Sequence, residues 1–149
     1  MKKIMFICTG NICRSAMAHG LMDKFVKEKN KDIGVYSCGI FAEDGDAPTY
    51  NAIEAIKEYG VDLRKHKATN IRNSRIKEMD IILCATTSHK NNVINMYPDL
   101  KEKIFTIKEY ADFDKNDLDI PDPWGYDIET YRFCASTINK CLERIVNKI

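Results

Sequence analysis

The chain has 149 residues, and 23 Lys and Arg stand against 22 Asp and Glu, which leaves a net charge of +1. This length predicts a single domain over 1–149, and the balanced charge argues against a nucleic-acid-binding protein, which would carry a clear excess of basic residues. The fractions of 44% hydrophobic and 30% charged residues are typical of a folded globular domain rather than of a disordered chain.

The N-terminus resembles neither a secretory signal nor a membrane anchor. Two lysines precede an apolar run of about five residues, whereas a signal peptide needs about 7–15 apolar residues. No segment approaches the roughly 20 apolar residues of a membrane span. We therefore expect a cytoplasmic protein in which most of the six cysteines are buried free thiols.

The first third of the chain predicts two strands and two helices. The apolar run 3–8 stops at a Gly-Asn turn, which is typical of a buried strand. The segment 15–29 spaces its apolar residues as a helix does, and 32–38 is a second strand candidate. A second helix is expected over 49–59, with Gly60 as its C-terminal stop.

The rest of the chain continues this alternation. The segment 80–85 contains four consecutive apolar residues, as expected for a central parallel strand covered on both faces. A helix is expected over 87–96 and a fourth strand over 103–107. After an acidic loop over 111–125, the last helix is predicted over 127–148, because its apolar residues recur in alternating steps of 3 and 4.

Strands that alternate with helices predict βαβ units with right-handed crossovers. The predicted fold is therefore α/β and three-layered, with a four-stranded parallel twisted sheet and helices on both of its faces. Ligands of such sheets bind at the carboxyl ends of the strands. The loop after the first strand is the first candidate for a functional site.

This loop has the residue types of an anion site with a nucleophile. Backbone N–H groups at a strand-to-helix turn, together with the helix N-terminus, attract anions. Gly10 and Asn11 tolerate the left-handed conformations that tight curvature demands, and the planar fork of Arg14 matches two phosphate oxygens. The same positive field favours the thiolate of Cys8, a nucleophile aimed at phosphorus. The loop reads Cys8-Thr9-Gly10-Asn11-Ile12-Cys13-Arg14-Ser15.

The loop resembles the active-site loop of the low-molecular-weight protein tyrosine phosphatases. A second segment, Asp122-Pro123-Trp124-Gly125, resembles the loop that carries the general acid of this family. The chain order also fits, since the cysteine loop comes first and the acid last, and the resemblance extends over nearly the whole chain. One departure is Ala16, where the family usually has a proline. Proline is favoured but not required at a helix N-terminus, so we expect little chemical effect.

The resemblance implies hydrolysis of phosphotyrosine in proteins, and of small aryl phosphates, through a phosphocysteine intermediate. Cys8 is then the nucleophile, Arg14 and the backbone N–H groups of residues 9–15 hold the phosphate, and Asp122 is the general acid and base. The resemblance implies no metal and no cofactor. We expect phosphotyrosine-containing proteins as partners, and a monomer.

The resemblance also assigns supporting roles. Ser15 would donate its hydroxyl to the thiolate, and Asn11 would hold the loop through contacts with Ser37 and His66. Trp124 would form a wall of the substrate pocket. Cys13 would be a redox partner that forms a reversible disulfide with the nucleophilic cysteine.

Three alternative functions remain open. Arsenate reductases share this fold and loop but use two further cysteines, and seven residues after Cys84 this chain has Asn91. Protein arginine phosphatases typically have threonine where this chain has Ile12, and a branched apolar residue suits a phenyl ring better than a guanidinium. A phosphate-binding module without turnover is the third alternative, against which the joint presence of Cys8, Arg14 and Asp122 argues.

Overall fold

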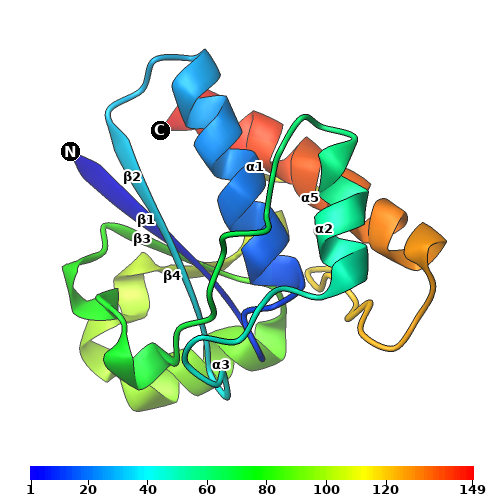
Figure 1. Ribbon diagram of the computed structural model, residues 1–149. Coiled ribbons are helices and arrows are strands. Elements are labelled where there is room, and N and C mark those ends of the chain that lie inside the picture. Colours follow the sequence, from blue (N-terminus) through cyan, green and yellow to red (C-terminus); the bar gives the residue numbers. More distant parts are fainter.

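The computed structural model describes residues 1–149 and contains one four-stranded parallel sheet with the strand order β2-β1-β3-β4 (Figure 1). Helices surround the sheet, so the predicted fold class is confirmed. All four strands were expected from the sequence to within two residues. They are β1 (Lys2–Cys8), β2 (Ile33–Gly39), β3 (Ile81–Cys84) and β4 (Ile104–Thr106).

The first strand shows why the apolar runs are continuous. Ile4 and Phe6 belong to one apolar core and Met5 and Ile7 to another, because successive side chains of a strand point to opposite faces of the sheet. Helices α1 (Arg14–Glu28), α2 (Tyr50–Lys57) and α5 (Ile128–Lys148) contribute to the first core, and α3 (Thr87–Met96) contributes to the second. Both faces of the sheet are therefore covered, in agreement with the three-layer prediction.

Short helical elements were not expected from the sequence. The predicted strand 103–107 ends at Thr106, whose side chain begins α4 (Ile107–Tyr110) in a capping box with Glu109. Three 3₁₀ helices also lie between the longer elements. They were not expected, because three to six residues are too few to create a recognisable period. They cover Ile71–Asn73, Ile76–Glu78 and Pro98–Lys103.

Gly60 marks the end of the second helix region, as predicted. Helix α2 ends at Lys57, and Gly60 adopts a φ of 77° while its N–H donates to the carbonyl of Lys57. This positive φ is the conformation that glycine adopts without steric cost. None of the helices is both long and apolar enough to cross a membrane.

Candidate active site

The loop 8–15 joins β1 to α1 and lines a pocket of about 220 Å³. Cys8, Ile12 and Arg14 come from this loop, and Asp122 and Trp124 reach the same pocket from the segment before α5. The structure thus brings together residues that lie more than one hundred positions apart. The pocket opens at the carboxyl end of the parallel strands, where an α/β sheet binds its ligands.

Asn11 shapes the loop through three hydrogen bonds. It is fully buried and adopts a φ of 57°, in the left-handed region. Its side-chain amide donates to Ser15 Oγ at 2.7 Å, and its Oδ1 accepts from the Thr69 N–H at 3.0 Å. Its carbonyl oxygen lies 2.9 Å from Nε2 of His66. The curvature of the loop is therefore fixed from within and from a second chain segment.

The expected contact between Asn11 and Ser37 is wrong. The Ser37 hydroxyl lies 2.8 Å from Nδ1 of His19, whose ring in turn packs edge-on against His66 at a centroid distance of 5.9 Å. Ser37 therefore contacts His19 of α1, and of the two expected partners only His66 contacts Asn11. Burial lowers the pKa of His19 to about 4, and burial also lowers the pKa of His66.

The end of β2 packs directly against the loop at Gly39. A Cβ atom on Gly39 would lie 2.5 Å from the carbonyl oxygen of Thr9, which no side chain permits. This close approach lets the N–H groups of Ile40 and Phe41 donate to the carbonyl oxygens of Cys8 and Thr9, at 3.0 and 2.9 Å. Carbonyl oxygens tied back in this way cannot turn into the pocket and repel an anion.

Cys8 is buried, and its Sγ lies 2.9 Å from Oγ of Ser15. Because Ser15 Oγ already accepts from the amide of Asn11, the hydroxyl hydrogen is free to point at the sulfur. A hydroxyl that donates to sulfur stabilises the thiolate over the thiol. The chain Asn11–Ser15–Cys8 therefore orients a donor toward the sulfur.

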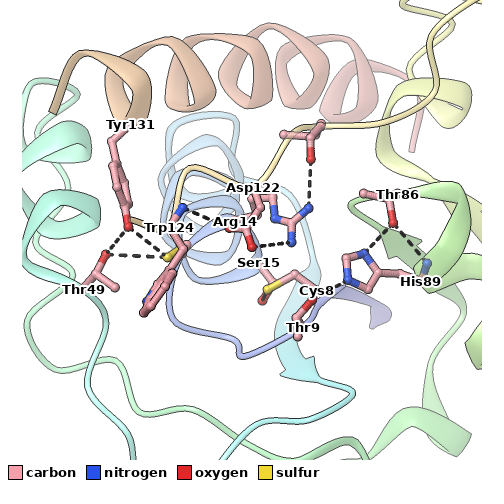
Figure 2. Close-up of polar contacts among 12 residues, drawn as sticks. Cys8, Thr9, Arg14, Ser15, Thr49, Thr86, His89, Asp122, Trp124 and Tyr131 are labelled. Carbon is pink, nitrogen blue, oxygen red and sulfur yellow. Dashed lines mark hydrogen bonds and ion pairs between the residues drawn. The ribbon is translucent and has the colours of Figure 1, made fainter. Parts of the chain in front are cut away.

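Arg14, in the same loop as Cys8, is almost fully buried (Figure 2). Its Nη1 donates to the carbonyl of Ile120 at 2.9 Å, and its Nη2 lies 3.5 Å from Oδ2 of Asp122. Its Nε is buried and has no hydrogen-bond partner in the chain. An unpaired buried N–H of a charged group is unfavourable unless a ligand accepts from it. The guanidinium is thus held in place through Nη1, and its Nε remains available to donate to an anion.

Asp122 and Trp124 form the outer side of the pocket. The Trp124 N–H donates to Oδ1 of Asp122 at 3.1 Å, which leaves Oδ2 directed toward Arg14. The side chain of Asp122 is 52% exposed, so it can exchange protons with water. Trp124 is 63% exposed and lends the pocket an aromatic wall.

A histidine that the sequence analysis missed supports the other side of the loop. His89 Nε2 lies 2.8 Å from Oγ1 of Thr9, and its Nδ1 lies 2.8 Å from Oγ1 of Thr86, the N-cap residue of α3. Burial, with a smaller contribution from the charge of Arg14, lowers the pKa of His89 to about 4. A neutral imidazole therefore connects Thr9 to the start of α3. The Thr-x-x-His pattern at the predicted helix start was the available sequence signal.

Two hydroxyl groups that were also missed hold Cys13. Its Sγ lies 3.3 Å from the Tyr131 hydroxyl and 3.7 Å from Thr49 Oγ1. Tyr131 lies on α5, and its side chain is buried. Burial raises the pKa of Cys13. All six cysteines are free and buried.

The chain matches a known protein family over nearly its whole length. The model of the family described as low molecular weight phosphotyrosine protein phosphatase matches residues 3–149. The chain belongs to this family. Its members are cysteine-based hydrolases that act on phosphoproteins through a phosphocysteine intermediate.

Individual relatives in this phosphatase family carry two names. The chain is 31% identical over 147 residues to a protein-arginine-phosphatase of Geobacillus stearothermophilus, covering 99% of this chain and 95% of that protein. It is 29% identical over 143 residues to the low molecular weight protein-tyrosine-phosphatase PtpB of Staphylococcus epidermidis, covering 96% of both. The crystal structure of a low molecular weight protein tyrosine phosphatase from T. tengcongensis superimposes with a TM-score of 0.93 at 35% identity, over the full length of both chains.

Proposed function

We propose that this phosphatase hydrolyses phosphotyrosine in proteins, with Cys8 as nucleophile and Asp122 as general acid. The observation that carries the choice of phosphotyrosine is that the apolar side chain of Ile12 lines the pocket together with Trp124. Apolar and aromatic walls favour a phenyl ring, which is desolvated at little cost, over a guanidinium, which would leave N–H groups unpaired.

In the first step, the Cys8 sulfur attacks phosphorus and forms the S–P bond while the bond from phosphorus to the tyrosyl oxygen breaks. Asp122 gives its proton to the departing oxygen, so tyrosine leaves neutral. Arg14 and the loop N–H groups hold the equatorial oxygens, where charge redistributes. The buried and unpartnered Nε of Arg14 supports this role, because it has a donor to spare for a phosphate oxygen.

In the second step, the Asp122 carboxylate takes a proton from a water molecule that attacks the phosphocysteine. A new P–O bond forms, the S–P bond breaks, and inorganic phosphate leaves. Ser15 assists the departing sulfur, since its hydroxyl lies 2.9 Å from Cys8 Sγ. The proton that Asp122 lost in the first step is thereby restored, and the cycle closes without a metal or a cofactor.

Phosphoarginine hydrolysis is the second candidate, favoured by the similarity to the protein-arginine-phosphatase of G. stearothermophilus. Arsenate reduction is disfavoured, because Cys84 is fully buried within β3 and the residue seven positions later is the exposed Asn91 on α3. A module that only binds phosphate is disfavoured by the proximity of Asp122 to Arg14, which such a module would not need.

The function is tested by measuring kcat/KM for a phosphotyrosine peptide and for the matching phosphoarginine peptide, with arsenate as a third substrate. We expect a preference for phosphotyrosine of about tenfold or more. Ile12→Thr is expected to narrow this preference, whereas the control Ile12→Val, which keeps a branched apolar side chain, preserves it. A wild-type preference for phosphoarginine would overturn the proposed substrate.

We also propose that the enzyme is a cytoplasmic monomer, one domain over 1–149, and that Cys13 protects the nucleophile by forming a disulfide with Cys8 under oxidation. The free state of all six cysteines is compatible with a reducing compartment. Mass spectrometry after mild peroxide treatment should detect a Cys8–Cys13 link, and recovery of activity with a thiol should follow. Oxidation of the nucleophile without such a link would rule out the protective role.

A further inference from the structure

A second hollow of about 480 Å³ lies beside the active-site pocket, between the loop after β2 and helix α3. One bank carries Phe41 and the other carries Asn92, Asn95 and Met96. In Figure 1, the end of β2 and helix α3 lie at the same end of the molecule. We call this hollow the α3 groove.

Both banks of the α3 groove begin at the phosphate loop. On one bank, the N–H of Phe41 donates to the carbonyl of Thr9, a residue that also lines the active-site pocket. On the other, His89 of α3 contacts the side chain of Thr9 at 2.8 Å. Asn92 and Met96 follow His89 at steps of three and four, which places them on the same side of the helix. Thr9, which lines the active-site pocket, thus contacts both elements that form the groove, the loop after β2 and helix α3.

The groove leaves the pocket on the side away from Trp124. Figure 2 shows Cys8 between Trp124 on one side and Thr9 with His89 on the other. The acid loop therefore borders one side of the bound phosphoryl group, and the α3 groove begins on the opposite side. A polypeptide whose phosphorylated side chain enters the pocket can extend along the groove without displacing the acid loop.

The surface of the groove suits an extended peptide. Phe41 is 75% exposed, and large exposed aromatic side chains are typical of the contacts that dominate protein interfaces. The amides of Asn92 and Asn95 are exposed and offer both donors and acceptors, as a peptide backbone requires. From His89 to Met96 the helix rises about 10 Å, at about 1.5 Å per residue. At about 3.3 Å per extended residue, this length accommodates about three residues.

We propose that the α3 groove binds the polypeptide segment of the substrate next to the phosphorylated residue, over about three residues in extended conformation. This inference rests on the proposed function, because only a protein substrate has such a flanking segment. Phe41 covers an apolar side chain of that segment, and Asn92 and Asn95 hydrogen-bond to its backbone.

The test compares two substrates that differ only in the flanking segment. One is phosphotyrosine itself, and the other is a capped heptapeptide with phosphotyrosine at its centre and alanine and leucine on both sides. For Phe41→Ala and for the double variant Asn92→Ala/Asn95→Ala, we expect kcat/KM for the heptapeptide to fall about tenfold through a higher KM. For phosphotyrosine itself, kcat/KM stays within about twofold of the wild-type value.

Matched controls come from residues outside the groove. Asn91→Ala removes an exposed amide from the same helix, and Phe133→Ala removes an aromatic ring that is 73% exposed on α5. Neither control variant should change kcat/KM for the heptapeptide or for phosphotyrosine. The proposal is wrong if the groove variants hydrolyse the heptapeptide with the kcat/KM of the wild type. It is also wrong if their kcat/KM falls equally for both substrates. Failure of the proposed function looks different, because the wild-type enzyme would then prefer a phosphoarginine peptide to the matching phosphotyrosine peptide, whatever the groove variants do.

Discussion

The positive φ of Asn11 and its two side-chain hydrogen bonds make a quantitative prediction about stability. In Asn11→Ala, the Thr69 N–H loses its acceptor and the Ser15 hydroxyl loses a donor. Leaving a partly buried donor unpaired costs about 1–2 kcal/mol. Placing alanine in the left-handed region at a φ of 57° adds about 1 kcal/mol. We expect the free energy of unfolding to fall by about 2–3 kcal/mol.

A comparison of three variants separates the two contributions. Asn11→Gly loses the same hydrogen bonds but adopts a positive φ without steric cost, so it should be about 1 kcal/mol more stable than Asn11→Ala. Asn30 has a φ of 50° and is exposed just beyond the end of α1, so Asn30→Ala isolates the conformational contribution. The free energy of unfolding of this control should fall by only about 1 kcal/mol.

Urea unfolding followed by far-ultraviolet circular dichroism measures these differences, provided that the denaturant slope is the same in all variants. In thermal unfolding, 2–3 kcal/mol corresponds to a decrease of about 4–12 °C in Tm for a chain of this size. The reasoning would be refuted if Asn11→Ala were as stable as Asn11→Gly, or if it lost no more than Asn30→Ala. The first result would remove the contribution of the backbone conformation, and the second would remove that of the hydrogen bonds.

Three further predictions concern chemistry and pH. Cys8→Ser should abolish hydrolysis of p-nitrophenyl phosphate, measured by absorbance, and still bind inorganic phosphate in calorimetry, since Arg14 and the loop N–H groups remain; persistent turnover would exclude Cys8 as nucleophile. Asp122→Asn should slow the first step most for aryl phosphates with poor leaving groups, so a plot of log kcat against the leaving-group pKa becomes steeper, and an unchanged slope would exclude Asp122 as the acid. Because burial lowers the pKa of His89 from 6.5 to about 4, protonation favours the unfolded chain between these pH values. The free energy of unfolding should therefore fall by up to about 3 kcal/mol from pH 6.5 to 4 on account of this group. For the variant His89→Gln, the free energy of unfolding measured by urea titration should fall correspondingly less over the same pH range. An equal fall in both proteins would contradict the burial argument.

The sheet and the phosphate loop were predictable from local sequence patterns. The continuous apolar run of β3 predicts a strand covered on both faces, and the core confirms it, because Ile81 and Leu83 belong to one apolar cluster and Ile82 and Cys84 to the other. The loop from Cys8 to Ser15 was also readable, because Asn11 adopts the left-handed backbone that its residue type tolerates and Arg14 supplies the local charge. Gly10, by contrast, does not adopt a positive φ, and a Cβ there would meet only the Ile12 side chain at 3.5 Å. Such features depend on residues that are neighbours in the chain, so a pattern of residue types is enough to predict them.

Only the tertiary structure decided how the loop is supported. Thr69, Ile120 and His89 reach it from three distant segments. Thr69 and Ile120 use main-chain groups, which leave no pattern in the sequence, and the Thr-x-x-His pattern of α3 does not reveal that His89 contacts Thr9. The contact expected from Ser37 was wrong, because the Ser37 hydroxyl pairs with His19 and the side chain of Asn11 pairs with Ser15 and Thr69. Helix α1 carries that imidazole, and its position depends on how α1 packs on the sheet. Long-range packing, unlike helical or strand periodicity, is set by the shape of the whole core.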